Sequence, residues 1–221
     1  DMKSKIIILT AFLVMWLFPC SHGLFQLSAK EKSLTLKTVV IDAGHGGHDP
    51  GGISTDRKTY EKNLTLDIAK RLGQKIKEKH PDVKVVYTRS KDVFVELSER
   101  ANIANRNNAD LFISVHTNAA QSKTAKGTET YALGLAKTEE NLQVAKRENS
   151  VILLEDDYTT KYEGFDPTSA ESYIMFDFMQ SMHLEQSINL ASSVQEQFRT
   201  KAKRSDRGVR QGAFWVLRAT S

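Results

Sequence analysis

The stretch from Val39 to Gly52, VVIDAGHGGHDPGG, constrains this chain more than any other. It begins as a β-branched apolar run, which is the pattern of a buried strand, and it ends in a glycine-rich loop. Residues that follow a strand of an open α/β sheet lie at the edge where ligands bind, so we expect His45 at such an edge. A lone histidine in a loop is more often a surface residue than a ligand. The remainder of the sequence has to decide between these interpretations.

The size and charge of the chain predict one globular domain and exclude some partners. Its 221 residues are 40% hydrophobic, which is enough for a core. We assign the domain to residues 37–221, with an insertion at about 135–183. The net charge of +4 is mildly basic, but the basic residues are dispersed and form no recognisable nucleic-acid-binding module. We therefore expect no nucleic-acid partner.

The first residues have the pattern of a secretory signal peptide. Two lysines precede an apolar run over residues 6–18, and small residues precede a cleavage site after Gly23. The run is shorter than the roughly 20 residues of a transmembrane helix, so membrane contact is expected only through residues 1–23. The single cysteine, Cys20, lies in the segment to be removed. With residues 24–36 as a tether, we expect an exported protein of the periplasm or cell envelope.

Apolar periodicity predicts strands that alternate with helices. Predicted strands cover residues 37–42, 83–88, 110–116 and 127–133, a region around Val209, and 214–217; predicted helices cover 61–79, 97–107, 138–154 and 184–201. This alternation is typical of an α/β fold with a parallel or mixed sheet and helices on both faces. The insertion is long for a crossover connection, which favours either a lid or an additional helix that covers the sheet.

Three residues of metal-ligand type fall at the predicted sheet edge. Glu61 begins a helix and His116 closes a strand, so both are expected beside His45. A glutamate at a helix start also stabilises the helix dipole, and alone it would be explained that way. Two imidazoles and one carboxylate with an open fourth position are the ligand set of a hydrolytic zinc site. We expect Asp42 and Asn118 to orient these ligands.

A set of motifs along the chain matches one known family. The motifs lie at residues 40–47, 60–64, 87–89, 97–102, 109–119, 127–129 and 214–217. With them, the chain resembles the zinc-dependent N-acetylmuramoyl-L-alanine amidases of bacterial cell-wall remodelling. The resemblance implies a three-layer α/β/α sandwich with a mixed, mainly parallel sheet. It also implies that His45, Glu61 and His116 bind Zn²⁺.

The same resemblance implies a reaction and a substrate. The family hydrolyses the amide between N-acetylmuramic acid and L-alanine of the peptidoglycan stem peptide. Its general base is a glutamate on a strand after the segment that contains Trp215, so we expect this residue and its strand beyond Ser221. Glu99 and Glu129 are poor substitutes, and no general base is assigned within the 221 residues.

In the division-associated branch of this family, an insertion carries a helix that covers the zinc until an activator protein displaces it. By resemblance to a Glu-Asn pair in that branch, Glu148 is our first candidate to fill the open zinc position, and Glu155 is the second. The alternative is that these acids only solvate a surface helix. Two other functions stay open: a peptidoglycan-binding module without activity, and a zinc peptidase acting on stem peptides.

Overall fold

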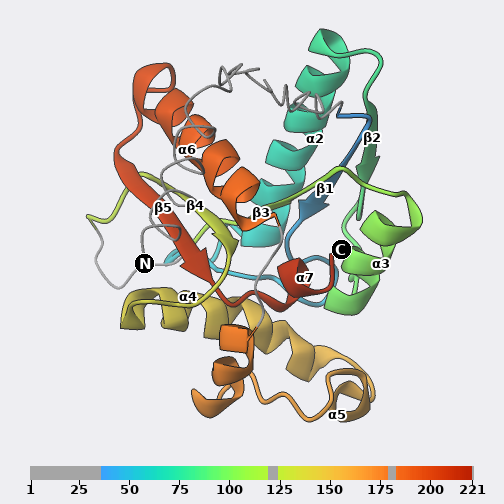
Figure 1. Ribbon diagram of the computed structural model, residues 1–221, viewed down its shortest axis with the longest axis vertical. Helices are drawn as coiled ribbons and strands as arrows, with labels where there is room; N and C mark the ends of the chain where they lie inside the picture. The colour runs from blue at the N-terminus through green and yellow to red at the C-terminus, as the bar shows by residue number, and fades with distance from the viewer. Residues whose placement is uncertain (1–35, 119–123, 179–182, 221) are drawn as a thin grey trace, which may run out of the picture. The chain divides into compact units, whose positions relative to one another are not determined.

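The predicted alternation of strands and helices is present in the computed structural model, which describes residues 36–118, 124–178 and 183–220 (Figure 1). The predicted signal peptide and most of the predicted tether lie outside these residues. In the part of the chain that is described, no helix combines the length and apolar character needed to cross a membrane.

A three-stranded parallel sheet is built around β1 (Thr38–Ala43). It lies between β2 (Lys84–Tyr87) and β3 (Leu111–Val115), and Ile41 pairs in register with Tyr87 on one side and Ile113 on the other. Every residue of β1 is buried, which explains its uninterrupted apolar pattern. The carboxyl end of this central strand leads directly into the glycine-rich loop.

Helices cover both faces of this sheet, as expected. Helix α2 (Glu61–Lys79) packs on the face that carries Val39 and Ile41, where Ala69 contacts them. Helix α3 (Leu97–Arg106) packs on the other face. Because side chains alternate along a strand, Asp42 belongs to the α3 face.

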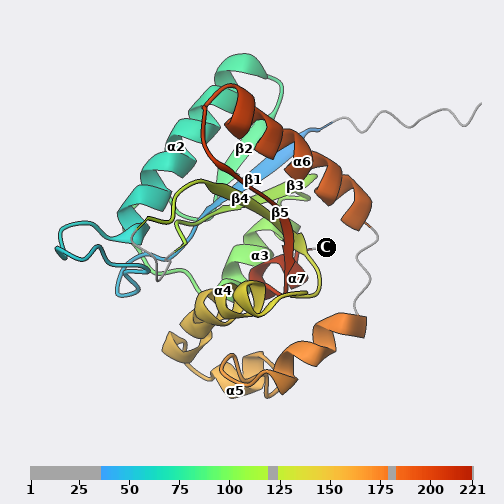
Figure 2. The ribbon, with the colours of Figure 1, turned by 90° about the vertical axis from the view of Figure 1, so that its left-hand side faces the viewer.

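A second parallel pair is formed by β4 (Thr128–Leu133) and β5 (Asp206–Gly212), and α6 (Leu184–Thr200) packs against both strands (Figure 2). The described strands therefore form two parallel sheets, of three and two strands, and all their pairings are parallel. The predicted α/β class with a mainly parallel sheet is confirmed.

The predicted insertion, residues 135–183, contains short helices that share one hydrophobic core with residues 213–217. They are α4 (Glu139–Asn149), η1 (Ser150–Leu154), α5 (Tyr158–Lys161) and η2 (Glu171–Phe178). Ile152 and Tyr162 are fully buried in this core, where Tyr162 packs edge-on against Trp215. The predicted helix over 138–154 is thus an α-helix that continues as a 3₁₀ helix. The short helix α5 follows it, and residues 179–182 lie outside the described residues.

The strand predicted at 214–217 is wrong, because this segment is the short helix α7 (Trp215–Arg218). The backbone N–H of Trp215 donates to the Asn149 side chain at 2.9 Å, and Leu217 closes a turn onto Phe214. The segment is apolar because it is buried in the core that it shares with the insertion, and it fills this position as a helix. A short buried apolar run does not distinguish the two structures.

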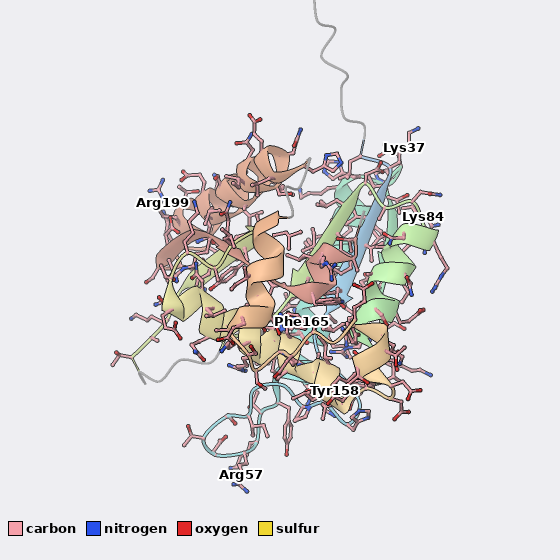
Figure 3. All side chains as sticks on the ribbon, turned by 60° about the horizontal axis from the view of Figure 1, so that its bottom comes forward. Lys37, Arg57, Lys84, Tyr158, Phe165 and Arg199 are labelled. Atoms are coloured by element: carbon pink, nitrogen blue, oxygen red, sulfur yellow. The ribbon has the colours of Figure 1, made fainter. Side chains whose placement is uncertain are left out.

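The two ends of the parallel sheet differ in what surrounds them. Lys37 and Lys84 lie at the amino end, whereas Arg57 lies on a loop that projects from the opposite side (Figure 3). Helix α4 runs past the carboxyl ends of the strands (Figure 1). The loops and the insertion therefore gather at the edge where the sequence predicts the site.

Candidate metal centre

The loop after β1 brings two histidine rings close together because glycine occupies critical positions. His45 has a left-handed backbone with φ of 63°. A Cβ atom at Gly51 would lie 2.5 Å from the His45 ring, and a Cβ atom at Gly44 would lie 2.3 Å from the His116 ring. Any side chain at either position would displace a ring. The two rings pack edge to face with centroids 4.8 Å apart.

Glu61 is the first residue of α2 and is fixed by backbone donors. Its Oε1 accepts a hydrogen bond from the N–H of Thr117 at 2.6 Å, and its Oε2 accepts one from the N–H of Gly52 at 2.8 Å. Thr117 directly follows His116. The glutamate therefore ties the end of the third strand to the loop after the first.

Four side chains converge at this point: His45, Glu61, His116 and Glu148 of α4. The Nε2 atom of His45 and the Nδ1 atom of His116 each lie 3.4 Å from Oε1 of Glu61. Oε2 of Glu148 lies 3.4 Å from the same nitrogen of His45 and 2.8 Å from that of His116. All four ligand atoms lie within 4.8 Å of one another.

This arrangement fits a tetrahedral metal ion. Bonds of about 2.0–2.1 Å to nitrogen and oxygen give a tetrahedron with edges of about 3.4 Å, which matches three of these four separations. The facing nitrogens of His45 and His116 and both carboxylate oxygens of Glu148 are buried without a hydrogen-bond partner among the described residues. Buried polar atoms almost always have partners, so this concentration indicates a site for a cation.

The electrostatics of the cluster also favour positive charge. Burial disfavours the imidazolium of His45, but Asp49, Glu148 and Glu61 outweigh burial and raise its pKa to about 11. Burial likewise opposes charge on His116, and Glu148 raises its pKa to about 9. Without a cation the two carboxylates hold protons on these rings, and a metal ion would replace those protons.

Asp49 is a site residue that the sequence interpretation missed. Its Oδ2 lies 2.7 Å from Nδ1 of His45, and its Oδ1 accepts a hydrogen bond from the N–H of Gly51 at 3.0 Å. A carboxylate on this ring nitrogen directs Nε2 toward the cluster. The signal was present in the sequence, since Asp49 lies four residues after His45 in the same loop.

The two residues expected to orient the ligands contact other groups instead. Within the described residues, Asp42 accepts hydrogen bonds from Thr88, Ser114 and Arg100 at 2.6, 2.6 and 2.8 Å. Asn118 donates to Glu129 at 3.3 Å. Among the described contacts, neither side chain reaches His45, Glu61 or His116. For Asp42 the reason is the alternation along β1, which turns its side chain toward α3.

Asp42 nevertheless acts on the site through Arg100. This buried arginine donates to the backbone oxygens of Ala43 and His45 at 2.8 and 2.9 Å. Arg89 donates to the oxygens of Ala43 and Gly44, both at 2.8 Å. Two guanidinium groups therefore hold three consecutive carbonyls of the loop, including that of the left-handed His45.

Helix α4 reaches the cluster with two adjacent residues. Arg147 donates to Oε2 of Glu61 at 3.1 Å, and Glu148 faces the histidines. The next residue, Asn149, donates to the oxygen of Ala213 at 2.8 Å and accepts from the N–H of Trp215. The end of the helix is thereby fastened to the segment before α7, which fixes where Glu148 points.

Glu155 lies elsewhere and has a structural explanation. Its Oε1 accepts a hydrogen bond from the N–H of Leu97 at 2.8 Å, and its Oε2 accepts one from the Tyr162 hydroxyl at 2.6 Å. Burial raises the pKa of this carboxyl. Glu155 therefore satisfies a backbone donor at the start of α3, and it is not one of the four converging residues.

The α/β fold and a cluster of two histidines and two glutamates that could hold a metal ion define the class of this protein, and the comparisons with known proteins identify the family. Residues 39–221 match the family model described as N-acetylmuramoyl-L-alanine amidase. The chain belongs to this family, as the sequence predicted.

Two curated relatives illustrate the extent of the similarity. The amidase AmiC of Escherichia coli O6:H1 strain CFT073 is 32% identical over 186 residues, which cover 82% of this chain and 42% of AmiC. The amidase AmiA of E. coli K12 is 30% identical over 207 residues, which cover 93% of this chain and 68% of AmiA. The chain thus spans less than half the length of the first of these relatives.

Solved structures agree on the fold. An N-acetylmuramoyl-L-alanine amidase from Clostridium difficile 630 superposes with a TM-score of 0.56 at 30% identity, covering 84% of this chain and 75% of that one. The catalytic domain of the amidase CwlV from Bacillus (Paenibacillus) polymyxa var. colistinus has a TM-score of 0.53 at the same identity and coverage.

Replacing Arg100 tests how the loop is held. Arg100→Met leaves the Asp42 carboxylate buried without its charged partner, so we expect the free energy of unfolding at pH 7 to fall by about 3–5 kcal/mol in urea titrations. Arg71→Met, which removes an exposed ion pair of α2 with Asp67, should leave it nearly unchanged.

The pH dependence has a definite sign. In the native protein burial opposes charge on Asp42, but Arg100, Ser114 and Thr88 prevail and lower the pKa of its carboxyl. The contribution of Asp42 to the free energy of unfolding is therefore present above the unfolded pKa of about 3.9, and it is lost as the pH falls through the folded pKa. The variant's deficit should therefore shrink from pH 7 toward pH 3. A deficit that is independent of pH would contradict this explanation.

Proposed function

We propose that this protein is an exported, zinc-dependent N-acetylmuramoyl-L-alanine amidase of the bacterial cell envelope. In this proposal it hydrolyses the amide that joins N-acetylmuramic acid to L-alanine of the stem peptide. The observation that carries it is the convergence of His45, Glu61 and His116 at ligand-to-ligand spacing. Membership of the family supports the substrate and the reaction.

The chain's own residues would hold the reacting groups. His45, Glu61 and His116 would bind zinc, which in such sites polarises the scissile carbonyl and lowers the pKa of its water. Asp49 keeps Nε2 of His45 directed at the cluster. Hydrogen bonds from the backbone N–H groups of Gly52 and Thr117 hold the Glu61 carboxylate in place.

We assign the general base to neither Glu99 nor Glu129. Glu99 pairs with Arg106 on the exposed surface of α3. Glu129 is held by Arg207 and accepts a hydrogen bond from the Tyr131 hydroxyl at 2.7 Å. A general base needs a carboxylate within reach of the attacking water, so we keep the proposal of a glutamate beyond Ser221.

We further propose that α4 inhibits the site until a partner displaces it. The contacts of Glu148 with both histidines support this, because a fourth ligand from the protein would exclude the attacking water. The buried position of Glu148, and the fastening of Asn149 to Ala213, argue against the alternative that this acid only solvates a surface helix. The partner proposed is an activator protein that acts on the insertion.

Metal content tests the ligand assignment. We expect one zinc per purified chain by elemental mass spectrometry, and none in the His45→Ala/His116→Ala double variant, since two of the ligands are then absent. His48→Ala is the matched control, because this neighbouring histidine stacks on Phe94 outside the cluster and its loss should not affect binding. Equal zinc in the double variant and the wild type would disprove the assignment.

The products test the reaction. The active form, meaning the enzyme together with its general-base glutamate, should release stem peptides with a free amino-terminal L-alanine from purified peptidoglycan. Intact glycan strands should remain, and mass spectrometry identifies both products. Cleaved sugar–sugar bonds would contradict an amidase. Stem fragments that lack L-alanine would indicate a zinc peptidase instead, and binding without any product would indicate a module without activity.

The rate of the active form tests inhibition by α4. Glu148→Ala should raise basal turnover about tenfold, the gain expected if α4 is displaced in roughly one molecule in ten. Glu139→Ala, an exposed substitution on the same helix, should have no effect. Glu155→Ala should lower stability without raising turnover, because it removes the acceptor for Leu97. An unchanged rate in a folded Glu148→Ala protein would mean that α4 has another purpose.

A further inference from the structure

A second charged cluster lies at the opposite end of α4 from Glu148. Arg207 and Arg210 of β5 both pair with Glu140, at 2.9 and 3.0 Å. Arg207 also pairs with Glu129 of β4, and Arg210 lies 3.8 Å from the same carboxylate. Nothing in the amidase chemistry described above uses these two arginines.

One face of α4 connects this cluster to the metal centre. The buried residues Asn141, Ala145 and Glu148 recur at helical spacing, so they lie on one side of the helix. Asn141 accepts a hydrogen bond from Arg210 at 2.9 Å. From Asn141 to Glu148 the helix rises by seven residues, or about 10 Å. The inner face of α4 therefore carries one contact to the arginines and another to the metal centre.

The arginines also connect with the strand end that carries His116. Their partner Glu129 accepts a hydrogen bond from Asn118 at 3.3 Å, two residues beyond that histidine. The Glu129 side chain is largely buried and belongs to β4, whereas Glu140 belongs to α4 and is mostly exposed. If α4 were displaced, the two guanidinium groups would keep one carboxylate partner, Glu129, among the residues that the structure describes. The cluster would then have one uncompensated positive charge.

We propose that Arg207 and Arg210 bind a carboxylate of the stem peptide when α4 is displaced, and that Glu140 occupies this position in its absence. This inference rests on the proposed amidase function. The helix then substitutes for substrate at both ends, with Glu148 at the metal centre and Glu140 at the arginines. The free carboxylates of the substrate belong to the stem peptide, because the carboxyl group of N-acetylmuramic acid forms the scissile amide and carries no charge. An extended peptide spans about 10 Å in three residues, the length of the α4 segment between the two contacts.

The experiment compares two peptides that differ only in charge. Titration calorimetry at low salt would use the zinc-loaded full chain, with the tripeptide L-alanyl-γ-D-glutamyl-L-lysine and the same peptide with its carboxylates amidated. The Glu140→Gln variant removes both the competing carboxylate and the ion pairs that hold this end of α4 against the arginines of β5. In this variant we expect the acidic peptide to bind about fivefold more tightly than the amidated one. It should also bind more tightly than it does to the wild type.

Removing either arginine should abolish the preference. Adding Arg207→Gln or Arg210→Gln to Glu140→Gln should make the two peptides bind equally, while Arg210→Lys should keep part of the difference. Arg199→Gln removes an exposed arginine of α6 that pairs with Glu196, and it should leave the preference intact. Thermal unfolding of each variant identifies any that has lost its fold. If one of the two arginine variants does not fold, the other still tests the proposal.

Each result separates the inference from the function on which it rests. Equal binding of both peptides to Glu140→Gln, or no binding of either, overturns the carboxylate site and indicates that the arginines only join α4 to the sheet. A preference that survives both arginine substitutions overturns it as well. Zinc content measured on the same samples tests the metal centre alone, so a zinc-loaded protein without a charge preference refutes only this inference.

Discussion

The buried pair between Asp42 and Arg100 is the interaction on which the site depends. Both side chains are almost inaccessible to solvent, so each requires the other to compensate for its lost hydration. The guanidinium of Arg100 has further N–H donors beyond the one that pairs with Asp42, and these hydrogen-bond to the carbonyl oxygens of Ala43 and His45. The buried ion pair in this way fixes the shape of the loop that carries His45.

The insertion is an integrated part of the domain rather than an appended flap. Its buried side chains, among them Ile152 and Tyr162, pack in one cluster with Trp215 and Leu97. Asn149 links the end of α4 to the same region through two backbone groups. Any partner that displaced α4 would therefore have to offset, with its own contacts, the loss of these hydrogen bonds as well as of the ion pairs.

The sequence predicted those parts of the fold and site that depend on local pattern. The helix over 61–79 has its predicted bounds, and His45, Glu61 and His116 converge because each ends or begins a regular element at one edge. What failed depended on tertiary contacts. The apolar run at 214–217 is helical because it packs under the insertion, and Asp42 turns away from the ligands because of its place in the pleat. Glu148 was found only through resemblance, since nothing local indicates where a helix in an insertion will dock.

The clamp on the loop has a consequence for the order of folding. Asp42 and Arg100 are 58 residues apart in sequence, and β1 is paired on one side with β3, which begins at Leu111. The loop that carries His45 therefore cannot adopt its final form until α3 has docked on the sheet. If such a chain crossed a membrane unfolded, the four converging side chains would come together only after its passage, once these long-range contacts had closed.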